Sequence, residues 1–492
     1  MHVTLMAQLT LRCTLPQHEF KAVQGSRMRP DPIYALLLFL HYGSITGSIT
    51  INSLQYADDL IIFANSQEVM QKHLDSLSEY CDKWGLSINT QKTKFMAIQN
   101  KKENVQLKIN NTNIEEISTY KYLGLIFNKN GDTHSIKNDL ANRALKSYFK
   151  LMKMMQPLPS IKTMIHLFDH LIKPILLYGC EVHTPVEINF KPPKSINNDR
   201  HAILNRLRQS IPIIMKFMAI SDPIEKINIK FCKQMLGVNQ KATNLGVYSE
   251  LGRYPLFIDQ IIQCIKYRSY VKFETKNSLI KEFFTEINNM PNIRHNLNTF
   301  VTQVLRNLNL QHLNESKMIK QHILTIKKKL HMQFENYWKT LLRTDTAMSG
   351  KKDGGNKLRT LNLFKTRYEF EPYLNIGNPE LRKALCKLRI SNHRLRIETL
   401  RFSNNYTYIP PSERTCLNCD NNCCEDECHF LIDCPAFKDN RATLWQEVHK
   451  INSHFQDYSS KNKMIWLMTQ ENVELLKQIA KFIKLSMDVR VS

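Results

Sequence analysis

Two short stretches of this 492-residue chain carry side chains of the kinds that bind metal ions. Near the N-terminus, the segment QYADDLIIFAN places Asp58 and Asp59 side by side between two runs of strand-forming residues. Near the C-terminus, the segment from Arg414 to Pro435 holds six cysteines and one histidine. Carboxylate oxygens suit Mg²⁺, whereas thiolates and imidazoles suit Zn²⁺, so the two stretches predict two different metal sites.

The acidic pair Asp58-Asp59 has two interpretations. One is a polar turn, but a tight turn between strands usually needs Gly or Asn at positive φ, and Ala57-Asp58-Asp59 supplies neither. The other is a Mg²⁺ site for phosphoryl transfer, in which two ions activate the attacking hydroxyl and neutralise the leaving pyrophosphate. Tyr56 would then offer an aromatic face to the substrate. A motif of four residues, Tyr-Ala-Asp-Asp, is a weak signal by itself. The surrounding elements must therefore decide between the turn and the Mg²⁺ site.

The C-terminal stretch has the ligand spacing Cys416-x2-Cys419-x9-His429-x4-Cys434. Three thiolates and one imidazole suit tetrahedral Zn²⁺, and four protein ligands make a closed, structural site. Ordinary buried cysteines are the alternative interpretation.

The short apolar run Ile33–Leu40 lacks the cleavage site and the N-terminal position of a signal peptide, so we expect an intracellular protein, with the nucleus as a plausible location. Six of the twelve cysteines crowd into the C-terminal stretch, which in such a reducing compartment indicates a metal rather than disulfides. Cys423, Cys424 and Cys428 are surplus to a four-ligand site, so Cys428 could replace one of the ligands.

The elements around the acidic pair follow from periodicity. Ser44–Phe63 predicts two strands that meet near the aspartates. Met70, Leu74, Leu77, Cys81 and Trp84 predict a helix, with Asn65 and Glu68 as a capping box and Gly85 as its end. Further strands are predicted at residues 95–98, 105–109 and 122–127, with a turn at Asn110-Asn111, and a helix over residues 140–155 that ends before Pro157.

A series of segments follows the acidic pair along the chain: 85–96 (GLSINTQKTKFM), 120–125 (YKYLGL), 176–181 (LLYGCE), 231–237 (FCKQMLG), 250–255 (ELGRYP) and 387–398 (KLRISNHRLRIE). In this order they resemble the reverse transcriptases of non-LTR (LINE-type) retrotransposons, in which YxDD is the palm motif. The resemblance covers roughly residues 45–445, and the order of the segments is more specific than any one of them. The cysteine-rich stretch is similar to the CCHC module near the C-terminus of LINE-type polyproteins.

The resemblance implies roles for individual residues. Asp58 and Asp59 would bind catalytic Mg²⁺, and Lys92 or Lys94 would lie near the incoming nucleotide. Leu123 and Gly124 would form the turn of the primer grip. The implied partners are an RNA and DNA template-primer.

The departures from the family matter as much. Its first palm aspartate, which shares both metal ions, has no counterpart, because no Asp precedes Asp31. The glycine-rich segment survives at most as an eroded Val23–Pro32, and His183 stands where relatives usually carry Trp. We therefore expect the C-terminal portion of such an element, a truncated RNA-directed DNA polymerase whose active site is incomplete unless an upstream half acts in trans. The alternative is a non-catalytic nucleic-acid-binding zinc-knuckle protein. Either way, the cut palm predicts an exposed half-sheet at the N-terminus.

Charge supports a nucleic-acid partner. Lys plus Arg number 68 against 44 Asp plus Glu, a formal net charge of +24 that favours a polyanion. The segment Lys317–Arg359 carries 11 Lys plus Arg against three Asp plus Glu. Within it, Lys327, Lys328 and Lys329 lie close in sequence to Phe334, Tyr337 and Trp338, which could stack on unpaired bases. The alternative is a helix whose Leu330, Phe334 and Trp338 pack in the core. A membrane is not expected, because the apolar run Ile33–Leu40 is far shorter than the roughly 20 residues that span a bilayer.

The expected fold class is α+β: a partial reverse-transcriptase palm of antiparallel strands backed by helices, then a mainly α-helical region and a small zinc knuckle. The expected divisions are an eroded N-terminal segment (1–44), the partial palm (45–130), thumb-like helices (131–190), a basic helical linker (191–410), the CCHC knuckle (411–445) and a helical tail (446–492).

Overall fold

The computed structural model describes residues 4–13, 53–56, 59–98, 105–130, 133–183, 222–277, 280–282, 284–285, 297–344, 358–403, 405 and 407–490. The chain divides into two compact units. The first comprises Met1–Ala144, Lys173–Leu207 and Asp259–Lys327, and the second comprises Leu145–Ile172, Arg208–Ile258 and Lys328–Ser492.

The first unit contains the main β-sheet, whose strands run in the order β2-β3-β1-β5-β8, with β4 also paired to β1. β1 pairs antiparallel with β3, β4 and β5, whereas β5 and β8 are parallel. The strands are β1 (Thr4–Cys13), β2 (Ser53–Tyr56), β3 (Asp59–Ala64), β4 (Leu86–Ile88), β5 (Lys94–Ile98) and β8 (Glu115–Glu116).

The position of β1 corrects one expectation. An exposed half-sheet was predicted for the N-terminal segment, but β1 lies inside the sheet, with β3 along one side and β5 and β4 along the other. The long β1 can serve two partners on one side because it is ten residues long and β4 takes only Leu11–Cys13. Within the described residues, the N-terminal strand is therefore paired on both sides and is not an exposed edge.

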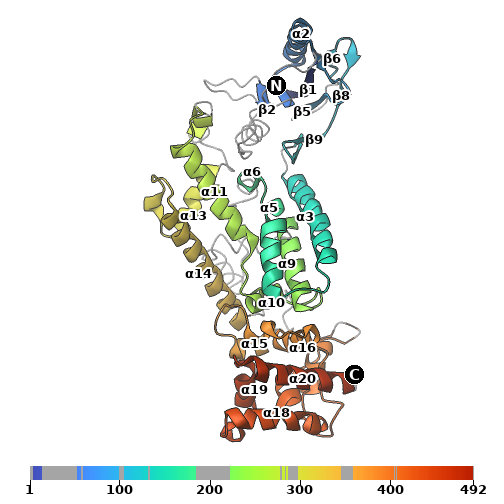
Figure 1. The fold of residues 1–492 in the computed structure, drawn as a ribbon, viewed down its shortest axis with the longest axis vertical. Helices are drawn as coiled ribbons and strands as arrows, with labels where there is room; N and C mark the ends of the chain where they lie inside the picture. Colours follow the sequence, from blue (N-terminus) through green and yellow to red (C-terminus); the bar gives the residue numbers. More distant parts are fainter. Residues whose placement is uncertain are drawn as a thin grey trace. The chain divides into compact units, whose positions relative to one another are not determined.

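Helix α2 (Gln67–Lys83) covers the sheet, as Figure 1 shows at the blue end of the chain. Its buried Met70 and Leu74 join Ile62 and Phe95 of the strands in one apolar core. The predicted helix is confirmed, but its cap is not, because the side chain of Ser66, rather than Asn65, accepts a hydrogen bond from the Val69 amide.

Two small hairpins complete the β structure. β6 (Lys108–Ile109) and β7 (Thr112–Asn113) are joined by Asn110-Asn111, both at positive φ, which confirms the predicted turn. β9 (Thr119–Tyr122) pairs with β10 (Leu125–Asn128). A single strand over 122–127 was predicted and is wrong, because Leu123 and Gly124 have φ of 44° and 84° and reverse the chain.

The remaining described elements are helical. The expected helix over 140–155 is confirmed as α3 (His134–Met154). The others are α4 (Ile161–Leu167), η1 (Phe168–Ile172), α5 (Lys173–Leu176), α6 (Cys180–His183), α9 (Pro223–Leu236), α10 (Asn244–Leu251), α11 (Leu256–Phe273), α13 (Leu297–Asn307), η3 (Gln311–Leu313), α14 (Lys320–Thr344), α15 (Arg359–Phe364), η5 (Pro372–Asn375), α16 (Pro379–Arg389), α17 (Arg396–Thr399), η6 (Pro411–Glu413), η7 (His429–Asp433), η8 (Pro435–Phe437), α18 (Lys438–Ile451), η9 (Phe455–Asp457), α19 (Ser460–Met468) and α20 (Val473–Val489).

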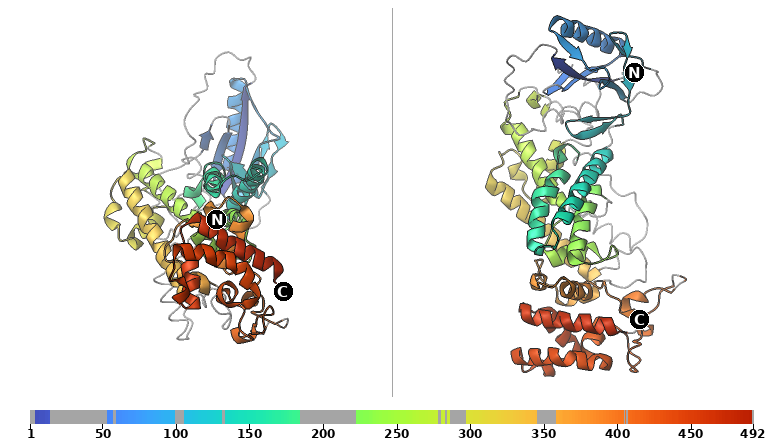
Figure 2. Two further views of the ribbon diagram at one scale, coloured as in Figure 1. Left: turned by 60° about the horizontal axis from the view of Figure 1, so that its bottom comes forward. Right: turned by 45° about the vertical axis from the view of Figure 1, so that its right-hand side comes forward.

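In the second unit, α20 is the central helix of the C-terminal part. It contacts α16 and α18, and α19 contacts η7. Figure 2 shows these orange and red helices stacked in successive layers. The face of α20 that makes these contacts is apolar and includes the buried Leu476, Ile479 and Ile483. In the described part of the chain, every helix is too short or too polar to cross a bilayer.

Candidate metal centre

The predicted zinc ligands come from a loop and one short helix of the second unit. Cys416 lies next to an isolated bridge between Thr415 and Cys424, and its amide donates to the Cys423 carbonyl at 2.8 Å. The Asn418 amide points at the Cys416 sulfur, 3.4 Å away. This is the backbone geometry of a knuckle, in which amides face a thiolate.

The other two ligands flank η7. His429 begins this helix, and its amide is capped by the Asp426 carboxylate at 2.8 Å. Cys434 follows the last residue of η7, and its amide donates to the His429 carbonyl at 2.8 Å. A short, internally bonded helix therefore fixes the separation of His429 from Cys434.

The structure brings the four donor atoms together. One ligand atom from each of Cys416, Cys419, His429 and Cys434 lies within 4.8 Å of the others. The Cys416 and Cys434 sulfurs are 4.0 Å apart, and the Cys419 sulfur is 3.5 Å from His429 Nε2. Zn–S bonds of about 2.3 Å and Zn–N bonds of about 2.0 Å at tetrahedral angles require roughly 3.8 Å and 3.5 Å for these edges. The donor set and its spacing fit Zn²⁺.

Burial shifts the pKa values of these donors towards their neutral forms. It raises the pKa of the Cys434 thiol to about 12 and raises that of Cys416. It lowers the pKa of His429, which keeps the imidazole neutral as a ligand must be. Zinc binding would therefore release thiol protons.

Arginines hold the backbone around the centre. The guanidinium of Arg490, at the end of α20, donates to both Glu425 oxygens at 2.6 Å, and the Arg396 amide donates to Glu425 at 2.8 Å. Arg441 donates to the carbonyl of Cys434 at 2.9 Å. These groups fix residues on either side of His429 and so support the ligand positions.

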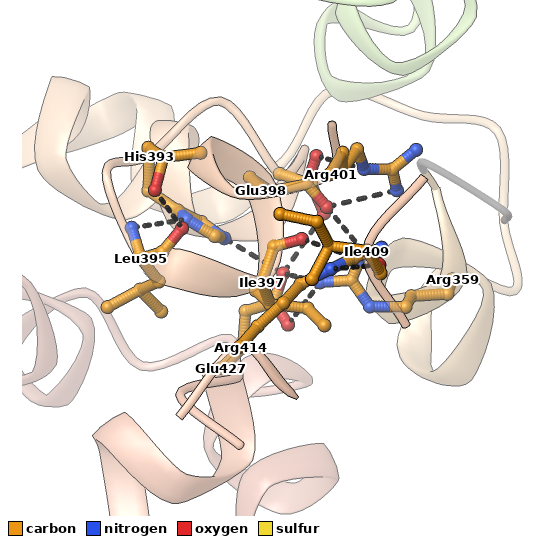
Figure 3. Close-up of polar contacts among 11 residues, drawn as sticks. Arg359, His393, Leu395, Ile397, Glu398, Arg401, Ile409, Arg414 and Glu427 are labelled. Carbon is orange, nitrogen blue, oxygen red and sulfur yellow. Dashed lines mark hydrogen bonds and ion pairs between the residues drawn. The ribbon is translucent and has the colours of Figure 1, made fainter. Parts of the chain in front are cut away.

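A second polar cluster lies beside the knuckle and is drawn in Figure 3. Glu427 accepts two hydrogen bonds of 2.8 Å from Arg359 and lies 2.8 Å from His393 Nε2. Burial alone would raise the pKa of Glu427, but the hydrogen bond from His393 and the charges of His393 and Arg359 hold it well below its usual range. Arg359 also pairs with Glu398, whose other oxygen lies 2.9 Å from Arg401.

A buried ion network joins two of the family-like segments. Arg389, from the 387–398 segment, donates to Glu250 of the 250–255 segment at 2.8 and 3.2 Å, and to Glu371 at 2.7 Å. It also donates to the Met468 carbonyl at 2.5 Å. The side chains of Arg389 and Glu250 are 2% and 0% exposed, so removing either one would leave the charge of the other buried without this partner.

The acidic pair lies in the first unit, and the structure describes half of it. Asp59 is the first residue of β3, where it pairs with Tyr56 of β2 on one side and Thr10 of β1 on the other. The predicted meeting of two strands is confirmed, whereas Asp58 lies outside the described residues. Burial, and then the negative charge of Asp59, raise the pKa of Tyr122, on β9, to about 12.

Asp59 does not complete a described metal site. Among the described residues, the group of Cys, His, Asp or Glu side chains that could hold an ion is the cysteine cluster, and it does not include Asp59. Because Asp58 lies outside the described residues, the Mg²⁺ role that the resemblance implied for Asp58 and Asp59 stays a prediction.

Side chains from other elements hold the turn at Leu123-Gly124, whose primer-grip role stays a prediction. The Tyr178 hydroxyl donates to the Leu123 carbonyl, and Arg143 donates to the Gly124 carbonyl, both at 2.7 Å. Gly124 needs its positive φ, and an added Cβ would lie 3.3 Å from the Tyr178 ring. The family-like segments 120–125 and 176–181 are thus in direct contact.

The two candidate nucleotide-site lysines differ in environment. Lys92 is exposed in the turn before β5. Lys94 is on β5, and its ammonium lies 2.6 Å from Glu115. Neither role is tested by these contacts, but Lys92 has the more accessible charge.

On α14, Phe334 and Trp338 match the packing alternative. Phe334 and Trp338 are fully buried, and both pack edge-on against Tyr368. They cannot stack on bases. Lys328 is exposed, Lys329 is half-buried, and Lys327 lies 3.6 Å from Asp259, so nucleic-acid contact by this triplet stays a prediction.

Sequence reasoning missed two features of the centre. Cys428 was considered as a replacement ligand, but neither Cys428 nor Cys423 is in the group of four converged donors. The Cys423 sulfur nevertheless lies 3.2 Å from His429 Nδ1. The pairing of Arg389 with Glu250 was also missed, because residues so far apart in sequence give no local signal of contact.

Comparison with known proteins agrees with this geometry at the first unit. Residues 34–127 match the family described as reverse transcriptase (RNA-dependent DNA polymerase). The chain is also 26% identical over 137 residues to an uncharacterised transposon-derived protein of Caenorhabditis elegans, a match that covers 27% of this chain and 49% of that protein. The chain thus spans about half the length of this relative. A reverse-transcriptase-like region therefore includes β2, β3, α2 and the β9–β10 hairpin.

Proposed function

We propose that the chain is a nucleic-acid-binding, reverse-transcriptase-like protein of a LINE-type retroelement that cannot synthesise DNA by itself. Its C-terminal part is built around a structural zinc ion held by the cysteine cluster. The observation that carries the proposal is the joint presence of the reverse-transcriptase match over residues 34–127 and the four converged zinc donors, in the order that the family-like segments have in LINE-type elements.

Catalytic incompleteness is supported by the strand next to Asp59. β1 pairs with β3 along its length, and Thr10 is the residue opposite Asp59. β1 has the sequence TLMAQLTLRC, which contains no Asp or Glu. Two-ion phosphoryl transfer needs oxygen ligands on both sides of the reacting phosphate, and Mg²⁺ gives up its waters reluctantly, so the aspartates would bind Mg²⁺ weakly.

Nucleic-acid binding is supported by one face of α3 in the second unit. Lys146, Lys150 and Lys153 recur at spacings of four and three, so they share one side of the helix, and all three are exposed. Phe149 lies between them, 53% exposed, with the Lys230 ammonium 4.6 Å from its ring centre. No Asp or Glu occurs between residues 140 and 168.

This face offers what unpaired nucleic acid needs. Ammonium groups meet phosphates, and an exposed aromatic ring can stack on a base. The RNA and DNA partners of a retroelement are therefore the ligands we propose, with the nucleus as the place where they would meet. An upstream polymerase half in trans would supply the missing carboxylate.

The binding proposal is tested by salt dependence. The full chain and a variant with Lys146, Lys150 and Lys153 changed to Gln are titrated with a fluorescent RNA–DNA template-primer from 50 to 300 mM salt. Three lost phosphate contacts should reduce the slope of log affinity against log salt by about 2 to 3. A matched control changes the exposed Lys450 and Lys481 to Gln and should leave the slope unchanged. Equal slopes for all three proteins would refute the assignment of this face.

The catalytic proposal is tested by primer extension. The purified chain with Mg²⁺ should not extend a primed template. Extension that disappears in Asp59→Ala would overturn it. Adding a separately produced palm fragment with an aspartate-bearing strand distinguishes the two candidate functions: restored extension favours the polymerase half, and none favours the non-catalytic binding protein.

A further inference from the structure

One cysteine outside the predicted ligand set lies against the metal centre. The Cys423 sulfur is 3.2 Å from His429 Nδ1 and 3.7 Å from His429 Nε2. Its backbone is part of the knuckle, since its carbonyl accepts from the Cys416 amide at 2.8 Å. Asn422, at φ of 47°, turns the chain into this position.

The distance to Nε2 is that of a coordinating pair. The Cys419 sulfur, a predicted ligand, is 3.5 Å from the same nitrogen. A sulfur and a nitrogen that share a tetrahedral Zn²⁺ are roughly 3.5 Å apart, so Cys423 lies about as far from Nε2 as a ligand does.

The other surplus cysteines have different surroundings. Burial and then the charge of Asp426 raise the pKa of Cys424 to about 11, and burial and then the charges of Asp426 and Asp433 raise that of Cys428 to about 12. None of the three surplus cysteines, Cys423 included, is in the group of four converged donors among the described residues; Cys423 differs from the other two in its short distances to both ring nitrogens of His429. Cys424 and Cys428 provide controls of the same chemistry a few residues away.

We propose that Cys423 is an interchangeable fourth ligand of the zinc centre. With His429 bound through Nε2, the Nδ1–H donates to the Cys423 sulfur and fixes the ring. When the imidazole leaves, the Cys423 thiol loses its proton to solvent and its thiolate binds in place of Nε2. The centre then has four thiolates and one more negative charge, with no oxidation or reduction. This inference rests on the proposed zinc centre.

Such an exchange is physically reasonable at this site. His429 is fixed at the start of η7, whereas Cys423 belongs to the loop that precedes it. A thiolate is the softer donor, and Zn²⁺ accepts both Cys₃His and Cys₄ sets in structural sites. One loop residue can therefore exchange with the imidazole while Cys416, Cys419 and Cys434 remain bound.

Cobalt substitution in the full chain tests the exchange. Co²⁺ is titrated into the unsubstituted chain, His429→Ala, Cys423→Ser and the double variant, and its absorption is recorded. We expect His429→Ala to keep one tetrahedral Co²⁺, with stronger sulfur charge-transfer absorption and d–d bands moved to longer wavelength. Cys423→Ser should keep the Cys₃His spectrum with about tenfold weaker affinity, the usual effect of losing an outer-shell partner. The double variant should lose the tetrahedral spectrum.

The controls are Cys424→Ser and Cys428→Ser, each made alone and combined with His429→Ala. The single variants should bind Co²⁺ with the spectrum of the unsubstituted chain, and the combined variants with the spectrum of His429→Ala. Loss of tetrahedral Co²⁺ in His429→Ala to the same degree as in the double variant overturns the exchange. His429→Gln provides a second removal of the imidazole if the alanine variant does not fold. If the unsubstituted chain binds neither Co²⁺ nor Zn²⁺, the proposed zinc centre itself is refuted. That outcome differs from failure of the exchange alone, in which the unsubstituted chain binds metal and only the variants disagree.

Discussion

Replacement of Arg389 by Met should strongly destabilise the second unit. Arg389 is 2% exposed and is the partner of Glu250, which is fully buried. Removing the guanidinium would leave the Glu250 carboxylate in the core without its two hydrogen bonds of 2.8 and 3.2 Å. Breaking a buried pair in this way costs about 3 to 5 kcal/mol.

The assay is thermal and urea unfolding followed by circular dichroism. For a unit of 150 to 250 residues, each kcal/mol lowers Tm by about 2 to 4 °C, so the midpoint should fall by about 6 to 20 °C. Arg367→Met is the matched control, because Arg367 pairs with Glu369 at 4.0 Å with side chains 75% and 55% exposed. It should change stability by less than about 0.5 kcal/mol.

A double variant separates loss of charge pairing from loss of packing. Arg389→Met combined with Glu250→Gln removes both members of the pair, so much of the stability should return. The reasoning is refuted if Arg389→Met lowers the free energy of unfolding by no more than Arg367→Met does. It is also refuted if the two single effects simply add in the double variant.

Three further predictions follow from the same unit. The pKa of the Glu427 carboxyl is lower in the folded chain than in the unfolded chain, so the ionised carboxylate stabilises the fold fully above about pH 4.3 and this contribution is lost as pH falls. Thermal melting should therefore show that Glu427→Gln is less stable than the unsubstituted chain at pH 7. The difference in melting temperature between the two proteins should narrow below pH 4. Gly252→Ala should lower the free energy of unfolding in urea by at least about 1 kcal/mol, because Gly252 has φ of 58° and the new Cβ would lie 2.6 Å from the Phe370 backbone nitrogen. An unchanged urea midpoint would contradict this prediction. A strong zinc chelator should lower the melting temperature and increase protease cleavage within residues 411–445, and identical melting with and without it would argue against a structural ion.

Local patterns predicted the elements well where side-chain periodicity and turn chemistry agree. The helix at residues 67–83, the Asn110-Asn111 turn and the strands that meet at the acidic pair are all of this kind. The segment 122–127 was misread because its apolar residues continue across a turn that depends on one glycine and one residue at positive φ.

Ligand spacing predicted which four side chains converge, because the geometry of a metal site restricts how far apart its ligands can lie in the sequence. It could not rank the surplus cysteines, since the loop conformation decides whether Cys423 or Cys428 faces the histidine. The apolar period on α14 likewise left core and stacking roles open for Phe334 and Trp338, and burial decided for the core. Proposed roles for Lys92, Lys94 and the α14 lysines depend on a bound template and remain predictions.

The Arg490–Glu425 pair affects the order in which the knuckle forms on the ribosome. The two residues are 65 positions apart, which at 5 to 20 residues per second is a delay of roughly 3 to 13 s. Nearly all of that interval follows the emergence of the cysteines and the histidine. A nascent chain can therefore capture its metal before the last helix arrives to neutralise Glu425, and metal capture would precede final docking.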